Sequence, residues 1–312
     1  MLAHIKEMIE INPAVKLQKG KSYPLIDIDK IIPGIRSVCS KELITYQGQS
    51  GCKFQNGDTL MARITPCLEN GKIAQAKIDA DAGIGSTELF VFRNRKDKTD
   101  GKWVYYFISS PYVRLSAINS MTGASGRQRA DKFFIERLKF DFPDLPTQEK
   151  IASILSAYDD AIENNNKRIK ILEKMAENLY REWFVRMRFP GHETAEYENG
   201  LPKGWKRTTV EALSSVLKRG ISPEYSEVAS SRVINQKCIR SSIMDITESR
   251  FQIKEFNQEL NLIDGDTVIC STGTGTLGRV GQIFGNYPNT TFDSHITMVR
   301  AKKGVGREYL YL

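Results

Sequence analysis

The sequence predicts an α+β protein in which two mainly-β domains lie in tandem, joined by a long coiled-coil spacer helix. Three observations support this fold class. An apolar heptad stripe runs through the middle of the chain, blocks before it recur after it, and most of these blocks are short β-branched runs that follow turn signals. We expect the first domain at residues 1–145, the spacer helix at 146–190 and a second, incomplete domain at 191–312.

The composition is that of a water-soluble globular protein with an excess of positive charge. The 312 residues are 26% charged and 40% hydrophobic, and we find no signal peptide or membrane span, so we expect a cytoplasmic location. Five scattered cysteines argue against a disulfide framework and against a zinc site. The net charge of +8 favours a partner such as nucleic acid.

The central stripe, which we call the seam, predicts a long amphipathic helix that needs a partner helix. Its members recur at alternating spacings of four and three among mostly charged neighbours: Ile151, Leu155, Tyr158, Ile162, Asn165, Ile169, Leu172, Ala176, Leu179 and Trp183. Thr147 can cap the start of the helix, and Pro190 and Gly191 should end it. Asn164, Asn165 and Asn166 are poor helix formers, but the seam keeps its phase across them, so we expect an unbroken helix.

The second domain repeats the first. Phe54–Met61 aligns with Leu262–Ile269, and Ser86–Arg93 aligns with Asp293–Arg300, at an offset close to 207 residues. A constant offset indicates tandem duplication. We also predict helices at Trp103–Asn119 and at residues 209–218, and a core strand that includes Phe133, Phe134 and Ile135.

A glycine-rich run from Gly273 to Gly278 matches the G-x-G-x-x-G pattern of dinucleotide-binding proteins. The residues that follow it alternate like a strand, so they offer no helix amino terminus to a pyrophosphate. A tight hairpin is therefore the favoured interpretation. The three histidines, His4, His192 and His295, have no neighbouring nucleophile or carboxylate that would make a catalytic group.

The order of these features resembles the specificity subunit of type I restriction-modification systems. The resemblance depends on the junction Leu145–Leu155, the helix down to Trp183 and Phe184, the domain opening Leu201–Trp205 and the segment Thr122–Gly126. Two features differ from that family. The first domain lacks a Leu-Pro-x-Gly-Trp opening, and a second spacer helix is missing.

The resemblance implies two target-recognition domains, each of which reads half of a split DNA sequence. It implies as partners two methyltransferase subunits that use S-adenosylmethionine and a restriction subunit that uses ATP, while this chain itself binds no cofactor or metal and catalyses no reaction. We also expect self-association through the spacer helix. Two alternatives stay open: a recognition fragment of a self-contained restriction-methylation polypeptide, and a coiled-coil scaffold without DNA contact.

Candidate DNA-binding residues are cationic or amide side chains in the predicted loops, because Arg suits the guanine edge, Gln suits the adenine edge, and Lys and Arg bind phosphates. The run from Ser125 to Lys132 is the best local candidate, with a polar surface loop as the alternative. Lys302, Lys303 and Arg307 are assigned to phosphate contact or plain surface. The candidates are Arg63, Lys72, Arg127, Gln128, Arg129, Lys132, Arg219, Arg232, Lys237, Arg240 and Arg279.

Overall fold

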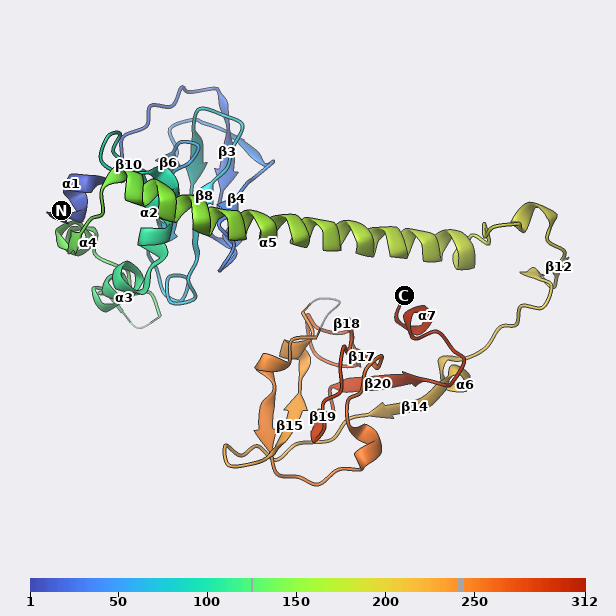
Figure 1. Cartoon of the computed structure of the whole chain (residues 1–312). Coiled ribbons are helices and arrows are strands. Elements are labelled where there is room, and N and C mark those ends of the chain that lie inside the picture. Colours follow the sequence, from blue (N-terminus) through green and yellow to red (C-terminus); the bar gives the residue numbers. More distant parts are fainter. Residues whose placement is uncertain (125, 241–243) are drawn as a thin grey trace. The chain divides into compact units, whose positions relative to one another are not determined.

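The computed structural model describes residues 1–124, 126–240 and 244–312, which form two compact units, Met1–Lys170 and Ile171–Leu312. The long helix α5 (Leu145–Tyr180) runs between the sheet-rich regions of the chain (Figure 1). This arrangement confirms the predicted α+β class. Among the described residues, none of the helices has the length and apolar character that a membrane span requires.

The first unit contains two main sheets and a small strand pair. The five-stranded sheet has the order β2 (Ile9–Ile11), β10 (Leu89–Asn94), β7 (Thr59–Ala62), β8 (Ile73–Ala76) and β4 (Ser37–Val38). The four-stranded sheet has the order β5 (Leu43–Thr45), β3 (Ser22–Ile26), β9 (Gly83–Gly85) and β6 (Cys52–Phe54). The pair is β1 (Leu2–His4) and β11 (Lys139–Asp141).

Short helices complete the first unit: α1 (Ile5–Met8), the 3-10 turn η1 (Ile28–Lys30), α2 (Gly101–Ser109), α3 (Pro111–Asn119) and α4 (Lys132–Arg137). The helix predicted at Trp103–Asn119 is present but broken. Ser110 is extended, and its side chain accepts a hydrogen bond from the Val113 amide, so it ends α2 and caps α3. Pro111 then occupies the first turn, where its missing N–H costs nothing.

The second unit repeats this plan. One sheet has the order β14 (Ser214–Arg219), β20 (Ile296–Ala301), β17 (Thr267–Cys270) and β18 (Val280–Gln282), and the other has the order β16 (Arg250–Gln252), β15 (Ser231–Ile234) and β19 (Thr290–Phe292). The remaining elements are η2 (Arg181–Val185), η3 (His192–Thr194), β12 (Tyr197–Glu198), β13 (Leu201–Pro202), α6 (Val210–Leu213), η4 (Gln236–Cys238), η5 (Ile246–Glu248), η6 (Gln258–Leu260) and α7 (Arg307–Tyr311).

The two units share strand order as well as sequence blocks. β10 and β20 are each flanked by the strand of a hairpin on one side, and β3 pairs in parallel with β9 as β15 does with β19. A buried carboxylate holds an arginine at the same place in both: Asp58 with Arg93, and Asp266 with Arg300. The units therefore have the same fold, as the tandem repeat predicts.

Two local predictions are wrong. Residues 209–218 are helical only at α6, and the rest is strand β14, because Ser214 and Val216 alternate inward and the strand pairs with β20. Phe133, Phe134 and Ile135 lie in helix α4, not in a core strand, and only Ile135 is buried. Phe133 is 66% exposed, so an apolar run at this place does not report a core position.

Helix α5 passes through Asn164–Asn166 without a break, which confirms its continuity. Its cap differs from the prediction: the Asp144 carboxylate accepts the Thr147 amide at 3.1 Å, so Asp144 rather than Thr147 caps the helix. The α-helical hydrogen bonding ends at Tyr180, before Pro190, and the π-helical turn η2 follows it directly. There, Phe184 packs against Trp205 and Tyr309 of the second unit.

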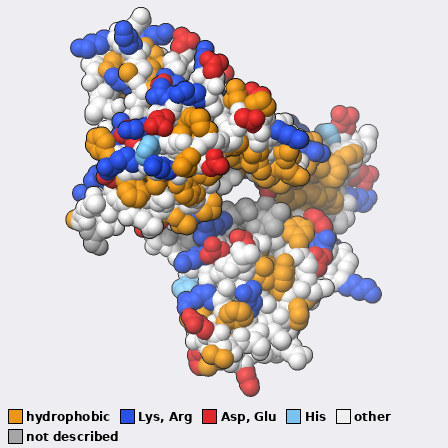
Figure 2. Space-filling model, turned by 60° about the vertical axis from the view of Figure 1, so that its left-hand side comes forward, with side chains coloured by type: hydrophobic (Ala, Val, Ile, Leu, Met, Phe, Trp, Pro, Cys, Tyr) orange, Lys and Arg blue, Asp and Glu red, His pale blue; other side chains and the backbone are white. Residues whose placement is uncertain are grey.

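The two faces of α5 differ. One face carries Ala152, Ser156, Asp159 and Glu163 and packs on the first unit: the Tyr106 hydroxyl donates to Asp159 at 2.5 Å, and the Ser37 amide donates to Glu163 at 3.2 Å. The seam lies largely on the exposed surface, and its residue Tyr158 is 69% exposed. Figure 2 shows hydrophobic side chains gathered along this helix.

Candidate nucleic-acid interface

Three of the predicted DNA-binding residues come together in the second unit. Lys237, Arg240 and Arg279, with Gln236 and Thr276, line one surface pocket of about 580 Å³ that we call the cationic pocket. Gln236, Lys237 and Arg240 come from η4 and the residues after it, between strands β15 and β16. Thr276 and Arg279 come from the loop between β17 and β18. Two loops far apart in the sequence therefore place three cations and an amide around one space.

Hydrogen bonds within and between the two loops fix these side chains. Gln236 Nε2 donates to the Thr272 carbonyl at 3.1 Å, and Arg279 Nη2 donates to the Gly275 carbonyl at 3.0 Å. Arg240 Nε donates to the Lys237 carbonyl at 3.0 Å. The remaining guanidinium nitrogens can still bind a ligand because an Arg side chain has five N–H donors.

The glycine-rich run is the turn of a hairpin. β17 and β18 pair antiparallel on either side of it, which confirms the hairpin interpretation and leaves no helix amino terminus for a pyrophosphate. Gly273 has a φ of +108°, and a Cβ at that position would lie 2.5 Å from Nε2 of Gln236. Glycine is therefore needed there for the close approach of the two loops.

The other two candidates of the second unit lie outside this pocket. Arg219 Nε donates to the Ser294 carbonyl. Arg232 stacks its guanidinium 4.6 Å from the centre of the Phe251 ring, and its Nε is buried. Each arginine therefore already has a partner within its own unit, a carbonyl for Arg219 and an aromatic ring for Arg232, and has fewer groups left to contact DNA.

The first unit holds its candidate loop by backbone bonds to the β7–β8 hairpin. The Thr65 amide donates to the Gln128 carbonyl at 3.0 Å, and the Ala130 amide donates to the Arg63 carbonyl at 2.8 Å. Arg127 is exposed, and its side chain makes no hydrogen bond to another described residue. Ser125, at the start of the predicted run, lies outside the described residues.

Arg129 has a partner already. Its guanidinium makes two-point contact with the Glu88 carboxylate, with Nη2 at 2.7 Å from Oε1 and Nε at 2.9 Å from Oε2. The hydrogen bonds from Arg129 lower the pKa of Glu88 below its ordinary value. The ion pair of Arg129 with Glu88 thus anchors the loop, and Arg127 and Gln128 directly precede Arg129 in the sequence.

The three remaining candidates of the first unit are also engaged. Lys132 pairs with Glu136 at 3.3 Å along helix α4. Lys72 Nζ donates to the Ile28 carbonyl at 2.8 Å, and Arg63 lies 4.8 Å from the centre of the Phe90 ring. Lys132 is the first residue of α4, and Lys72 directly precedes strand β8.

Sequence reasoning missed Gln236 and Thr276. Gln236 directly precedes the candidate Lys237, and Thr276 lies three residues before the candidate Arg279. What connects them is the packing of the two loops, which a linear pattern does not show. Among residues 1–124, 126–240 and 244–312, no group of three His, Cys, Asp or Glu side chains is placed to hold a metal ion.

Comparison with known proteins identifies the family. Residues 3–174 match the family model described as type I restriction modification DNA specificity domain, which covers more than half of the chain. The chain belongs to this family.

Curated relatives of this specificity-domain protein are specificity subunits. It is 29% identical over 223 residues to the type I restriction enzyme MjaIX specificity subunit of Methanocaldococcus jannaschii, covering 66% of this chain and 49% of that protein. It is 39% identical over 99 residues to the EcoAI specificity subunit of Escherichia coli, covering 31% of this chain and 17% of that protein. The chain thus spans half or less of the length of these two relatives.

A solved structure supports the fold of this family member. The type I restriction-modification system S subunit of M. genitalium aligns with a TM-score of 0.50 at 16% identity, over 99% of this chain and 74% of that one. At this identity the likeness concerns the fold alone.

Proposed function

We propose that this chain binds duplex DNA at a split sequence as the specificity subunit of a type I restriction-modification complex. The observation that carries the proposal is the cationic pocket, where Lys237, Arg240 and Arg279 converge with Gln236 on a protein of the specificity-domain family. Cations bind phosphates and the guanine edge, and a glutamine amide can pair with adenine. The family match favours this function over a scaffold without DNA contact and over a self-contained enzyme fragment.

Each unit would read one half of the target. In the second unit, the cationic pocket would contact the DNA, with Arg219 and Arg232 beside it as weaker candidates. In the first unit, Arg127 and Gln128 would read bases, Arg129 would hold their loop, and Arg63, Lys72 and Lys132 would act through phosphates if they contact DNA. Residues 1–145 and 191–312 would then be the two recognition domains, and 146–190 the spacer.

The chain would recognise DNA and leave the chemistry to its partners. We assign adenine methylation to methyltransferase subunits that carry S-adenosylmethionine, and cleavage to a restriction subunit that uses ATP. No cofactor or metal is assigned to this chain. These partner assignments follow from the family and from the names of the relatives, which are specificity subunits of type I restriction enzymes.

The exposed seam supports a helix partner. Ile162 is 49% exposed, Leu172 59% and Leu179 50%, although each buried large apolar side chain stabilises a folded protein by roughly 1.5–3 kcal/mol. We propose that a second copy of this helix, or a helix of a partner subunit, covers the seam in the working complex.

The direct test is DNA retention by the purified chain. Fluorescence anisotropy with labelled duplexes should show binding, and the logarithm of the association constant should fall linearly with the logarithm of the salt concentration. Arg240→Ala and Arg279→Ala should weaken this DNA binding, and Lys303→Ala, at an exposed site outside the cationic pocket, should weaken it less.

Methylome sequencing of cells with and without the gene would identify the target, because the methylated motif that disappears with the gene is the motif that the chain recognises. Binding that ignores salt, or no binding, would contradict the proposal.

A further inference from the structure

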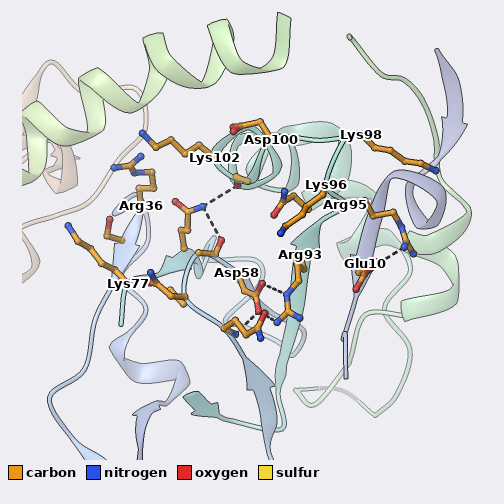
Figure 3. Close-up of a pocket in the computed structure, with 18 of the residues that line it drawn as sticks. Glu10, Arg36, Asp58, Lys77, Arg93, Arg95, Lys96, Lys98, Asp100 and Lys102 are labelled. Atoms are coloured by element: carbon orange, nitrogen blue, oxygen red, sulfur yellow. Dashed lines mark hydrogen bonds and ion pairs between the residues drawn. The ribbon is translucent and has the colours of Figure 1, made fainter. Parts of the chain in front are cut away.

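The first unit contains a basic depression of about 1140 Å³ that the proposed DNA contacts do not use. It lies between the turn Gln55–Asp58, the end of strand β10, the start of helix α2 and helix α5. Figure 3 shows its lysines and arginines arranged around this hollow.

The depression and the proposed DNA loop lie at opposite ends of the same strands. Thr59 pairs with Phe92 at the end next to the depression, and Ala62 pairs with Leu89 at the other end. Arg63, which follows Ala62, is bonded to Ala130 of the loop that carries Arg127. A ligand in the depression would therefore be separate from DNA bound at that loop.

The arginines of the depression are already neutralised. Arg93 pairs with Asp58 at 2.6 Å and Arg95 pairs with Glu10 at 3.0 Å, while Arg36 is buried and pairs with Asp160. Seven cationic side chains face four carboxylates in all, which leaves an excess of three positive charges. The unneutralised charge is thus on the lysines.

Four exposed lysines surround the depression. The ammonium groups of Lys77 and Lys96 make no hydrogen bond or ion pair to another described residue. Lys102 Nζ reaches only Ser156 Oγ, at 3.5 Å, and Lys98 Nζ donates to the Glu7 carbonyl at 3.1 Å. Ammonium groups with few protein partners on flexible stems are available to bind carboxylates of another molecule.

The second unit closes the equivalent place with its own side chain. Its corresponding turn is Asp264–Asp266, and there Arg307 forms an ion pair with Asp264. A Cβ at Gly265 would lie 2.7 Å from Cδ of Arg307, so this arginine lies directly over the turn. A Cβ at Gly57, the matching glycine of the first unit, would meet no atom within 4 Å, so the corresponding turn is uncovered there.

We propose that this depression docks an acidic, extended segment of a partner protein. The lysines would bind its Asp and Glu carboxylates. The lining carboxylates and amides could accept backbone N–H groups of the segment, whereas a DNA phosphate has no donor to offer them. This mixed lining favours a peptide over a nucleic acid.

The test measures binding of a fluorescein-labelled peptide of alternating Glu and Gly to the full chain at low ionic strength, with a Gln and Gly peptide as the neutral probe. A triple variant, Lys77→Glu with Lys96→Glu and Lys102→Glu, should lower the affinity for the acidic peptide at least roughly tenfold. The matched control, Lys16→Glu with Lys19→Glu and Lys41→Glu, changes the net charge equally at exposed sites outside the depression and should change it little.

Neutral replacement of Lys77, Lys96 and Lys102 by Gln, with unchanged thermal unfolding midpoints, separates lost binding from lost folding. Duplex DNA affinity of the charge-reversed variant should match that of its control. Equal peptide binding by wild type and both depression variants would overturn the proposal, as would a selective loss of DNA binding, which would make the depression a nucleic-acid surface. Failure of wild type to bind DNA would contradict the proposed function instead, without affecting the peptide result.

Discussion

Arg93 of strand β10 and Asp58, which directly precedes strand β7, form a two-point ion pair, with Nη2 at 2.6 Å from Oδ2 and Nε at 2.8 Å from Oδ1. Asp58 is only 3% exposed, and it also accepts the Gln55 amide of its own turn at 2.7 Å. Asp266 and Arg300 repeat the arrangement in the second unit. The pair joins the turn before β7 to strand β10, which is the neighbour of β7 in the sheet, so it fixes where the hairpin begins.

Removing one member of this pair should destabilise only the unit that holds it. We expect Asp58→Ala to lower the free energy of unfolding of the first unit by about 3–5 kcal/mol, because Arg93 would be left largely buried without its carboxylate. Hydrogen exchange read by mass spectrometry should show faster exchange in β7 and β10. Asp266→Ala should instead affect β17 and β20, and an equal effect of Asp58→Ala on both units would contradict this independence.

The Glu88–Arg129 pair should make part of the stability depend on acid pH. Because pairing lowers the pKa of Glu88 in the folded chain from its ordinary value of 4.5, the stabilisation is full above that value and is lost as the pH falls through the folded pKa. Both side chains are partly exposed, so solvent screening should keep the contribution small. Wild type should exceed Glu88→Gln in unfolding free energy at neutral pH, and the gap should narrow in acid. Glu69→Gln, at an exposed site, should show no such pH-dependent gap.

Arg127 should act as a base reader in the first half-site. We expect Arg127→Ala to cost about 1–3 kcal/mol on the cognate duplex and to relax preference at one base pair. Lys303→Ala should weaken all sequences alike. Lys303 is a better control than Lys302, whose Nζ donates to the Ala212 carbonyl at 2.8 Å. Equal losses on cognate and scrambled DNA would make Arg127 a phosphate contact.

Neighbouring residues of α5 offer a matched test of the seam. Ile171 and Leu172 are both 59% exposed, but only Leu172 belongs to the seam. If the seam is a helix interface, Leu172→Glu should weaken self-association by at least about tenfold, whereas Ile171→Glu should weaken it less. Light scattering over a concentration series measures this. A wild-type chain that stays monomeric at micromolar concentration would rule out self-association.

The spacer should act as a ruler in the full two-domain assembly. A heptad inserted after Leu172 keeps the seam in phase and lengthens the helix by about 10.5 Å, close to three base pairs of rise. Methylome sequencing should then find the same half-sites with a longer gap between them. A two-residue insertion should rotate the seam and impair assembly. An unchanged gap after the heptad insertion would exclude the ruler.

Periodicity and repetition predicted the parts of the fold that depend on local pattern. The seam identified α5, and the block from Leu262 to Ile269 identified the β17 hairpin, because each pattern spans several turns or strands. Predictions failed where long-range pairing decides. Ser214–Arg219 becomes a strand by pairing with β20 despite its helix-like composition, and the bond between Arg129 and Glu88 joins residues 41 apart. Lys237, Arg240 and Arg279 were separate DNA-binding candidates in the sequence, and their meeting in one pocket depends on how two loops pack.

The early part of α5 must satisfy two sets of neighbours at once. Between residues 151 and 163, the first unit uses one face through Ala152, Ser156 and Asp159, and the seam residues lie on the neighbouring face, about 100° around the helix. Farther along, only the seam has an assigned role. In evolutionary terms, sequence drift should be slowest in the early turns and faster near Asn164–Asn166, so a deep mutational scan of the helix should show tolerance rising from one end of it toward the middle.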